Sequence, residues 1–274
     1  MKNQKEIENW NGPIGQRWVT FQEALDVRIR RYGEEVLAKA SLTEGARVLD
    51  VGAGCGDISL AASRAVGPKG EVVGVDISRP MLDRARERAK DLPNVKLVEH
   101  DASTFTTDRP FDHVISRFGV MFFDDPVAAF VNIHSATKPG GRLTFVCWQA
   151  LADNPWAALP LATVVKVLPT PPVPPPADAP GPFAFADAER LRGILARSGW
   201  KDVELTPFTC DMELGSDLED ALDYASRMGP SARALVDADD ATRARAVEAL
   251  RSSLAPLAPK FALSSAVWIV SAKA

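Results

Sequence analysis

Short apolar runs alternate with amphipathic stretches through the first half of the chain. Runs of mostly aliphatic residues predict buried strands at 47–51, 71–75, 95–99, 112–117 and 142–148. The stretches between them repeat apolar residues every three to four positions, which predicts helices at 57–66, 79–91 and 126–137. Strands and helices that alternate at this spacing form parallel sheets with right-handed crossovers. The pattern therefore predicts an α/β fold.

The pattern changes outside this region. Apolar residues at helical spacing predict one or two helices over residues 13–40. After Trp148 we expect helices at 154–168 and 187–198, a strand at 203–208, more helices over 217–255 and a final strand at 262–272. From Pro169 to Pro182, eight of fourteen residues are proline, which excludes a helix or a central strand. A linker or lid margin is expected there, and a site for a proline-binding partner is the alternative.

Composition narrows the class of protein. The 274 residues are 46% hydrophobic, enough for one large domain or one domain with a cap. The net charge is −4 and basic residues are interspersed with acids, so we expect no nucleic-acid partner. The densest basic stretch, 84–90, falls on a predicted helix and is interpreted as a solvated face. Because no long apolar run is present, we also expect no membrane partner.

The cysteines give no sign of a metal site or of disulfide bonds. Cys55, Cys147 and Cys210 are far apart and lack the spacing of zinc ligands. Free cysteines are typical of a reducing compartment, so we expect a cytoplasmic protein. The oligomeric state stays open, with a homodimer as the alternative to a monomer.

The first predicted strand ends in a loop with glycine at every second position. Residues 47–57 read Arg-Val-Leu-Asp-Val-Gly-Ala-Gly-Cys-Gly-Asp, so the strand runs directly into Gly52, Gly54 and Gly56. Such a loop before a helix lets a ligand lie against bare backbone at the positive helix end. Asp76 closes the second strand, where an acid commonly binds both hydroxyls of a ribose. Together these features predict a nucleoside-containing cofactor.

The spacing of the loop indicates which cofactor binds. A dinucleotide loop requires glycine or alanine where this chain has Asp57, and Asp50 would repel a pyrophosphate. A carboxylate at Asp50 suits a cationic ligand group instead. With Asp50 and Asp76, the loop resembles motif I of the class I S-adenosylmethionine-dependent methyltransferases. The resemblance extends from about Val48 to Trp148.

This resemblance implies a seven-stranded, doubly wound Rossmann-like sheet whose last strand is antiparallel, with helical cap insertions. Further segments that look like family motifs are 73–78 with Met81, 99–102, 111–116 and 138–143. Within the family, the chain is similar to small-molecule enzymes such as the quinone-biosynthesis methyltransferases. The expected divisions are an N-terminal helical lid at 1–40, a cofactor-binding core at 41–150, a proline-rich cap insertion at 151–185, continued core at 186–214, a helical cap insertion at 215–259 and a final core strand at 260–274.

The resemblance also implies cofactor contacts. Asp76 would bind the ribose, Asp101 with Ala102 would meet the adenine, and Asp50 would orient the loop or meet the methionine amino group. Structural alternatives are a helix-capping acid at Asp76 and a loop-stabilising carboxylate at Asp50. The full expected cofactor set is Asp50, Gly52, Ala53, Gly54, Gly56, Asp76, Ile77, Met81, Asp101, Ala102, Ser116, Arg117, Trp10 and Gln16.

Arg117 is the single catalytic candidate. It leaves the fourth strand at a position that faces the methionine end of the cofactor and the acceptor in related enzymes. A buried arginine needs an anionic partner, so we expect it to position a carboxylate of the cofactor or acceptor. A structural ion pair with a nearby acid is the alternative. The expected acceptor-binding residues are Trp18, Phe118, Met121, Trp148, Asn154 and Trp156, with packing of the cap as the alternative for the last three.

Residues 10–18 combine two tryptophans with two glycines. We interpret this segment as a lid that folds onto the cofactor. The alternative is a hydrophobic staple for the first helix, without a gating role.

Methyl transfer from a sulfonium requires little beyond alignment of the reactants and exclusion of water. The sequence therefore predicts S-adenosylmethionine-dependent methyl transfer to a small, largely apolar acceptor by in-line displacement. Whether carbon, oxygen or nitrogen accepts the methyl group stays open. The alternatives are an NAD(P)-dependent oxidoreductase and a non-catalytic S-adenosylmethionine-binding protein.

Overall fold

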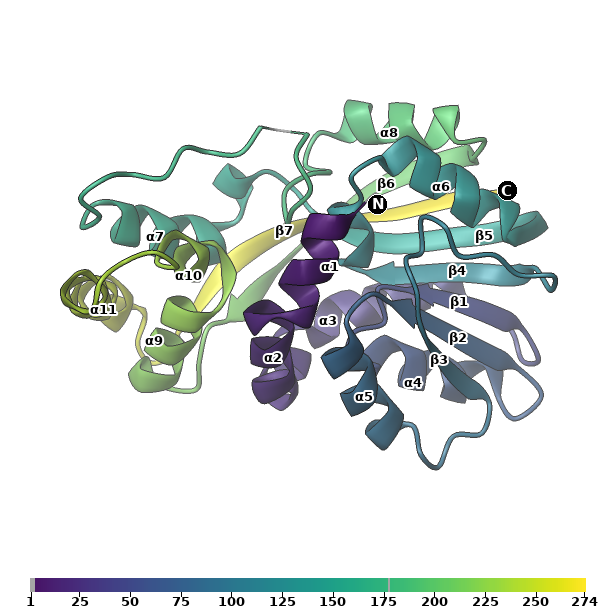
Figure 1. Ribbon diagram of the computed structural model, residues 1–274, viewed down its shortest axis with the longest axis horizontal. Helices are drawn as coiled ribbons and strands as arrows, with labels where there is room; N and C mark the ends of the chain where they lie inside the picture. The colour runs from purple at the N-terminus through teal and green to yellow at the C-terminus, as the bar shows by residue number, and fades with distance from the viewer. Residues whose placement is uncertain (1–2, 177) are drawn as a thin grey trace. The chain divides into compact units, whose positions relative to one another are not determined.

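The structure is a computed structural model that describes residues 3–176 and 178–274 (Figure 1). Its strands form one seven-stranded sheet in the order β3-β2-β1-β4-β5-β7-β6. Their bounds are β1 (Arg47–Val51), β2 (Glu71–Asp76), β3 (Val95–Glu99), β4 (Phe111–Arg117), β5 (Thr137–Trp148), β6 (Lys201–Glu213) and β7 (Ala262–Lys273). The pairs among β1 to β5 are parallel, and β7 pairs with β5 in the antiparallel direction. The predicted Rossmann-like sheet with an antiparallel final strand is confirmed.

The helices follow the predicted alternation. Their bounds are α1 (Gln4–Asn11), α2 (Pro13–Thr20), α3 (Gln22–Ala40), α4 (Asp57–Val66), α5 (Arg79–Arg88), α6 (Pro126–Ser135), α7 (Pro155–Val165), α8 (Ala188–Arg197), α9 (Leu218–Arg227), α10 (Gly229–Ala234) and α11 (Asp240–Leu254). Short 3₁₀ turns are η1 (Gly119–Phe122), η2 (Leu151–Asp153) and η3 (Ala255–Leu257). The sequence pattern does not predict α1, because Ile7 and Trp10 alone are too few apolar positions to show a helical period.

The chain divides into two compact units. The first comprises the chain up to Trp148 together with Asp178–Pro207 and Val267–Ala274, and the second comprises Gln149–Ala177 and Phe208–Ala266. In the second unit, α7 packs against α10 and α11, and α9 packs against the same two helices. Whether this unit caps an acceptor pocket stays a prediction. Within the described ranges, no helix combines the length and apolar content needed to cross a membrane.

The centre of the first unit is β1, which is buried on both of its faces. Val48, Leu49 and Val51 are fully buried, because β1 pairs with β2 on one edge and with β4 on the other and α4 packs against it. Such double burial explains the nearly continuous apolar run in this strand. The carboxyl ends of β1, β2 and β4 lead to Gly52, Asp76 and Arg117, as the sequence predicts.

Carboxylates cap several helices. Asp125 accepts a hydrogen bond from the Ala128 backbone N–H at 3.0 Å at the start of α6. Ser78 occupies the N-cap position of α5 but makes no capping bond. Its hydroxyl instead donates to the Trp10 carbonyl at 2.7 Å, because α1 lies against the start of α5. Ser78 therefore joins the N-terminal segment to the loop that follows β2.

Candidate cofactor-binding site

The glycine loop joins β1 to α4 in a conformation that favours glycine. Gly52, Gly54 and Gly56 have φ angles of 73°, 54° and 88°. A Cβ atom on Gly52 would lie 2.6 Å from the Cα atom of Gly119, so the loops after β1 and β4 cross only because both residues are glycine. This crossing leaves bare backbone at the carboxyl ends of two neighbouring central strands.

Helix α5 packs against the other side of the loop. A Cβ atom on Gly54 would meet the terminal methyl of Met81 at 3.0 Å, and one on Gly56 would meet the Cβ atom of Ala85 at 3.0 Å. Met81 is thus buried against the loop, whereas Ile77 is partly exposed at the end of β2. The cofactor contacts expected of Met81 and Ile77 stay predictions.

Asp76 connects the glycine loop to the start of α5. Its Oδ2 accepts from the Gly54 backbone N–H at 2.8 Å, and its Oδ1 accepts from that of Ser78 at 2.8 Å. Burial raises the pKa of this carboxyl, while backbone hydrogen bonds partly oppose the shift. A carboxylate offers about four acceptor positions, so Asp76 keeps acceptor capacity for a ligand donor beside the backbone N–H groups that it already binds. The geometry is compatible with ribose binding and with the alternative of a helix-capping acid, because the same two oxygens can accept hydrogen bonds from backbone and ligand together.

Asp50 is a buried carboxylate that is only half satisfied. Its side chain is 0% exposed, and Oδ2 accepts from the Ser59 hydroxyl at 2.5 Å. Among the residues that the structure describes, Oδ1 has no hydrogen-bond partner. Burial raises the pKa of Asp50 to about 7, against the lowering effects of Ser59 and Arg117. An orphaned buried oxygen indicates a place for a donor from a ligand or a water molecule.

We expect Asp50 to make the stability of the ligand-free protein depend on pH. Its pKa is about 7 when folded, above the ordinary value of about 3.9 in an unfolded chain. Between these values the folded state holds a proton that the unfolded chain has released. The free energy of unfolding therefore falls as pH rises through this window and levels off above about 7.

Thermal melts of wild type and Asp50→Asn at pH 5, 6, 7 and 8 check this dependence. The amide mimics the protonated carboxyl, so the variant should lose less stability over this range and exceed wild type at pH 8. The lowered pKa of His113 acts in the opposite direction but is common to both proteins. Melting temperatures that change with pH by the same amount in both proteins would contradict the assignment of this pH dependence to Asp50.

Asp101 follows β3 and lies beside the N-terminal segment. Its Oδ1 accepts from the Ser103 backbone N–H at 2.8 Å, and its Oδ2 accepts from the Asn3 side-chain amide at 2.8 Å. Ala102 is buried next to it. The contact with Asn3 could not be predicted, because a single asparagine in a polar segment carries no pattern.

Ser116 and Ala53 have mainly structural surroundings. The buried Ser116 hydroxyl donates to the Val51 carbonyl at 2.6 Å and accepts from the Gly119 backbone N–H at 3.2 Å. It thereby fixes the crossing of the β1 and β4 loops. Ala53 is buried and its backbone N–H donates to the Val75 carbonyl at 3.2 Å. Cofactor contacts from Ser116 and Ala53 stay predictions.

Arg117 is engaged in a buried ion-pair network. Its side chain is 10% exposed, and its guanidinium lies 2.6 Å from Asp57 and 3.6 Å from Asp26. Arg88 contacts the same two acids, at 2.8 Å from Asp26 and 3.6 Å from Asp57. It also donates to the Cys55 carbonyl of the glycine loop at 2.7 Å. These ion pairs are the partners that the structural alternative expects, whereas a role of Arg117 in positioning a carboxylate stays a prediction and would require exchange of these partners.

The same network corrects the interpretation of the basic stretch at 84–90 as an entirely solvated face. Arg88 points inward and ties α5 to the glycine loop and α3. The sequence could not distinguish it from Arg84 and Arg86, because helical periodicity alone does not show which neighbouring element supplies acids.

The N-terminal segment lies against the carboxyl edge of the sheet. Trp10 makes edge-to-face contacts with Trp18 and Phe122, with ring centroids 5.9 and 5.2 Å apart. Its indole N–H donates at 3.2 Å to Glu6, a buried carboxylate that no sequence pattern reveals. Gln16 is exposed on α2. The structure thus brings Trp10 and Trp18 to the site region, while the expected ligand contacts of Trp10, Trp18 and Gln16 stay predictions.

An aromatic cluster follows the end of β4. Phe118 stacks on Trp148 with ring centroids 4.3 Å apart and an interplanar angle of 9°, and Tyr32 meets both rings edge to face. Phe118 has a φ of 65°, an uncommon conformation for an aromatic residue and one often found at functional sites. Met121 is buried in the adjoining turn η1. Phe118, Trp148 and Tyr32 thus form one aromatic cluster in the first unit, and the acceptor contacts expected of Phe118, Met121 and Trp148 stay predictions.

Asn154 and Trp156 lie in the core of the second unit, and their expected contact with an acceptor stays a prediction. The Asn154 amide is 0% exposed and donates to the carbonyls of Gln149, Ala150 and Ala266. Its oxygen accepts from the Ala266 backbone N–H and from the Trp156 indole. Every polar group of Asn154 is therefore used internally. The packing alternative describes both residues, and Asn154 contacts an acceptor only if this network opens.

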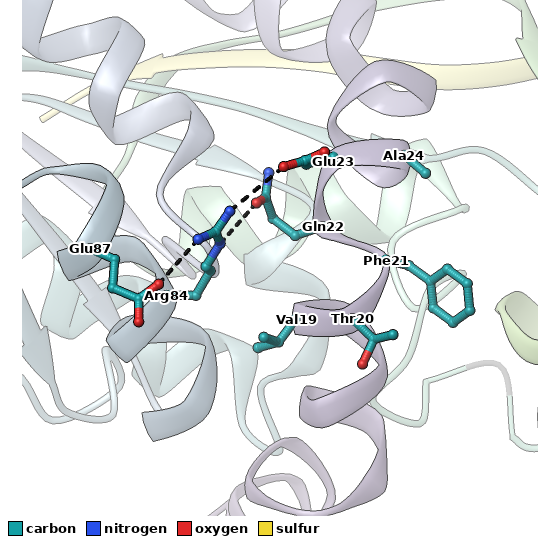
Figure 2. Close-up of a pocket in the computed structure, with 8 residues that line it drawn as sticks. All are labelled: Val19, Thr20, Phe21, Gln22, Glu23, Ala24, Arg84 and Glu87. Carbon is teal, nitrogen blue, oxygen red and sulfur yellow. Dashed lines mark hydrogen bonds and ion pairs between the residues drawn. The ribbon is translucent and has the colours of Figure 1, made fainter.

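A cleft of about 690 Å³ opens at the junction of α2 and α3, facing α5 (Figure 2). Figure 2 shows Arg84 reaching from α5 to Gln22, Glu23 and Glu87. None of the expected cofactor or acceptor residues lines it. Because none of its lining residues belongs to the glycine loop or to the aromatic cluster, this hollow is separate from both.

Comparisons with known proteins agree with the geometry. A family model described as a methyltransferase domain matches residues 48–141. The demethylmenaquinone methyltransferase of Staphylococcus carnosus is 29% identical over 186 residues, which cover 64% of this chain and 76% of that enzyme. The Staphylococcus aureus enzyme is 38% identical over 117 residues, which cover 42% of this chain and 48% of that enzyme, so the match spans about half of its length.

The fold is shared with solved structures. The YcgJ protein of Bacillus subtilis aligns with a TM-score of 0.58 over 89% of this chain and 98% of that chain, at 16% identity. The family match covers the glycine loop, Asp50, Asp76 and Asp101, which are the residues that the structure gathers at one edge of the sheet. The oxidoreductase alternative is therefore set aside: the chain carries a class I S-adenosylmethionine-dependent methyltransferase domain at residues 48–141, and its cofactor is S-adenosylmethionine.

Proposed function

We propose that this chain transfers a methyl group from S-adenosylmethionine to a small, largely apolar acceptor that carries an aromatic or quinol ring. The observation that carries the proposal is the aromatic cluster of Phe118, Trp148 and Tyr32 directly after β4, beside the crossing of Gly52 and Gly119. Flat apolar rings stack favourably on such surfaces. The similar staphylococcal enzymes are named for a quinone-type acceptor, which supports the same class.

The residues at the carboxyl edge suit this cofactor. Asp76 would hold the ribose hydroxyls, Asp101 the adenine amino group, and the unpartnered oxygen of Asp50 would receive a donor from the methionine end. The carboxylates favour a ligand with positive charge and many donors over one with phosphate groups. When bound, the cofactor supplies an electrophilic methyl group, and the acceptor loses a proton as it gains the methyl carbon.

The main contribution of the chain to catalysis is to position the cofactor and the acceptor. Aligning two reactants within a closed site removes the entropy cost of bringing them together. This lowers the activation free energy by up to on the order of 7–11 kcal/mol. The buried aromatic cluster also excludes water from the reacting atoms.

Transfer of a labelled methyl group tests the proposal. The purified protein is incubated with labelled S-adenosylmethionine and a panel of a naphthoquinol, a phenol, an aliphatic amine and an aliphatic carboxylate. We expect label in the quinol or phenol fraction. Label only in the amine or carboxylate fraction overturns the acceptor class. Cofactor binding without transfer to any of the panel favours the non-catalytic alternative.

We expect Phe118→Gly to raise the KM for the acceptor about tenfold while leaving cofactor affinity unchanged. Glycine adopts the φ of 65° without strain, so the change removes the ring but keeps the backbone. Loss of stacking and of buried apolar area accounts for this magnitude. Steady-state kinetics with calorimetric titration of S-adenosylhomocysteine measure the two effects separately.

The control is Phe105→Leu, which alters a partly exposed ring that contacts His100 and Phe111 and not this cluster. An unchanged KM in Phe118→Gly would show that the ring does not face the acceptor. A loss of cofactor affinity of the same size would assign Phe118 to the cofactor side.

A further inference from the structure

Helix α1 bridges loops that follow three different strands (Figure 1). At its C-terminal end, the Asn11 amide donates to the Ile77 carbonyl at 2.8 Å and accepts from the Arg79 backbone N–H at 3.0 Å, both just after β2. At its N-terminal end, Asn3 bonds to Asp101 after β3 and to Asp124 after β4 and η1. The helix therefore crosses the carboxyl edge of the sheet, where the glycine loop lies.

Asn3 is built into this edge by reciprocal hydrogen bonds. It is 4% exposed and adopts a φ of 59°, a conformation that asparagine tolerates better than most residues. Its backbone N–H donates to Asp124 Oδ2 at 2.5 Å, and its side-chain oxygen accepts from the Asp124 backbone N–H at 2.8 Å. Its side-chain amide donates to Asp101 Oδ2 at 2.8 Å. Asn3 thus connects the two loops through every polar group of its side chain.

These contacts orient the Asp101 carboxylate without neutralising it. The Asn3 amide holds Oδ2 and the Ser103 backbone N–H holds Oδ1, which fixes both oxygens in one orientation. Over the described ranges no Lys, Arg or His forms an ion pair with Asp101, so no cation competes with a ligand donor for its oxygens. Each oxygen keeps a free acceptor position for a ligand donor.

We propose that Asn3 is a positioning residue of the cofactor site. It holds Asp101 so that the remaining acceptor positions of the carboxylate take the amino group of the cofactor's adenine, and its bonds to Asp124 close α1 over that end of the site. This inference rests on the assignment of Asp101 to the adenine. It extends the cofactor site to an element that no sequence motif covers.

The experiment compares two ligands and three variants by calorimetric titration of the full chain. The ligands are S-adenosylhomocysteine and S-inosylhomocysteine, in which a carbonyl replaces the adenine amino group. The variants are Asn3→Ala, the isosteric Asn3→Asp, which removes the donor to Asp101, and the control Gln4→Ala, whose side chain bonds only to the exposed Glu8.

We expect Asn3→Ala to weaken S-adenosylhomocysteine binding about tenfold, Asn3→Asp to weaken it more, and Gln4→Ala to leave it unchanged. S-inosylhomocysteine should bind wild type more weakly and lose almost nothing further in Asn3→Ala. In an Asp101→Ala background, Asn3→Ala should add no loss, because its effect passes through that carboxylate.

Equal losses for both ligands would overturn the proposal, since Asn3 would then only anchor α1. Tighter binding of S-adenosylhomocysteine to Asn3→Ala would also overturn it, because the amide would then compete with the adenine for Asp101. Unchanged affinity in both Asn3 variants has the same consequence. No acceptor is present in these titrations, so their outcome is independent of the proposed acceptor class.

Discussion

Replacing Asp76 with alanine should weaken binding of S-adenosylhomocysteine by at least about tenfold. A carboxylate that accepts hydrogen bonds from two ribose hydroxyls contributes roughly 1.5–3 kcal/mol, which corresponds to about 10- to 150-fold in the dissociation constant. The same change frees the backbone N–H groups of Gly54 and Ser78, which now donate to this carboxylate at 2.8 Å each. Both effects act in the same direction on the affinity, because the loop that Asp76 holds is the floor of the site.

A matched control separates ligand contact from loss of structure. Asp112 also accepts from a backbone N–H, that of Arg47 at 2.9 Å, and it accepts from Lys138 at 2.6 Å. It lies near the amino end of β4, opposite the cofactor edge. Asp112→Ala should therefore lower the melting temperature without changing the affinity measured by calorimetry. Equal affinity losses in Asp76→Ala and Asp112→Ala would mean that Asp76 acts through stability alone.

The sheet could be predicted from the sequence because its signals are local. The apolar runs at β1 and β2, the glycines after β1 and the capping Asp125 each act within a few residues of chain. Parallel order then follows from the alternation of strands and helices. The same local signals located the glycine loop and Asp76, because a glycine-rich turn and a strand-ending acid are adjacent to the elements that define them.

The contacts of the site were harder to predict because they join distant segments. Arg117 pairs with Asp57 and Asp26, which lie about 60 and 90 positions away in the chain, and no pattern links them. Asn3 and Asp101 are likewise far apart in the sequence and come into contact only in the folded chain. Asn154 illustrates the converse. It is expected near the acceptor, but its side chain forms hydrogen bonds with backbone groups of its own unit. Residue type and position in sequence do not show which of these outcomes a fold selects.

Valine at Gly54 should abolish measurable cofactor binding in a protein that still folds. The position has a φ of 54°, which a β-branched residue strongly disfavours, and its new side chain would push against Met81 at the back of the loop. The Gly54 backbone N–H also donates to Asp76, so a displaced loop moves the ribose acid with it. Losing both the bare backbone surface and the position of Asp76 should reduce cofactor affinity more than losing either one alone.

Gly45→Val is the control for backbone strain, because Gly45 has a φ of 79° and a Cβ atom added there would meet no described atom within 4 Å. It precedes β1 and lies outside the glycine loop. Both variants should show lower melting temperatures, whereas S-adenosylhomocysteine should raise the melting temperature of wild type and Gly45→Val only. A ligand-induced rise in Gly54→Val equal to that of wild type would show that the loop does not approach the cofactor. Because Gly45→Val carries the same strain without the same place in the fold, the difference between the two variants isolates what the loop contributes to binding.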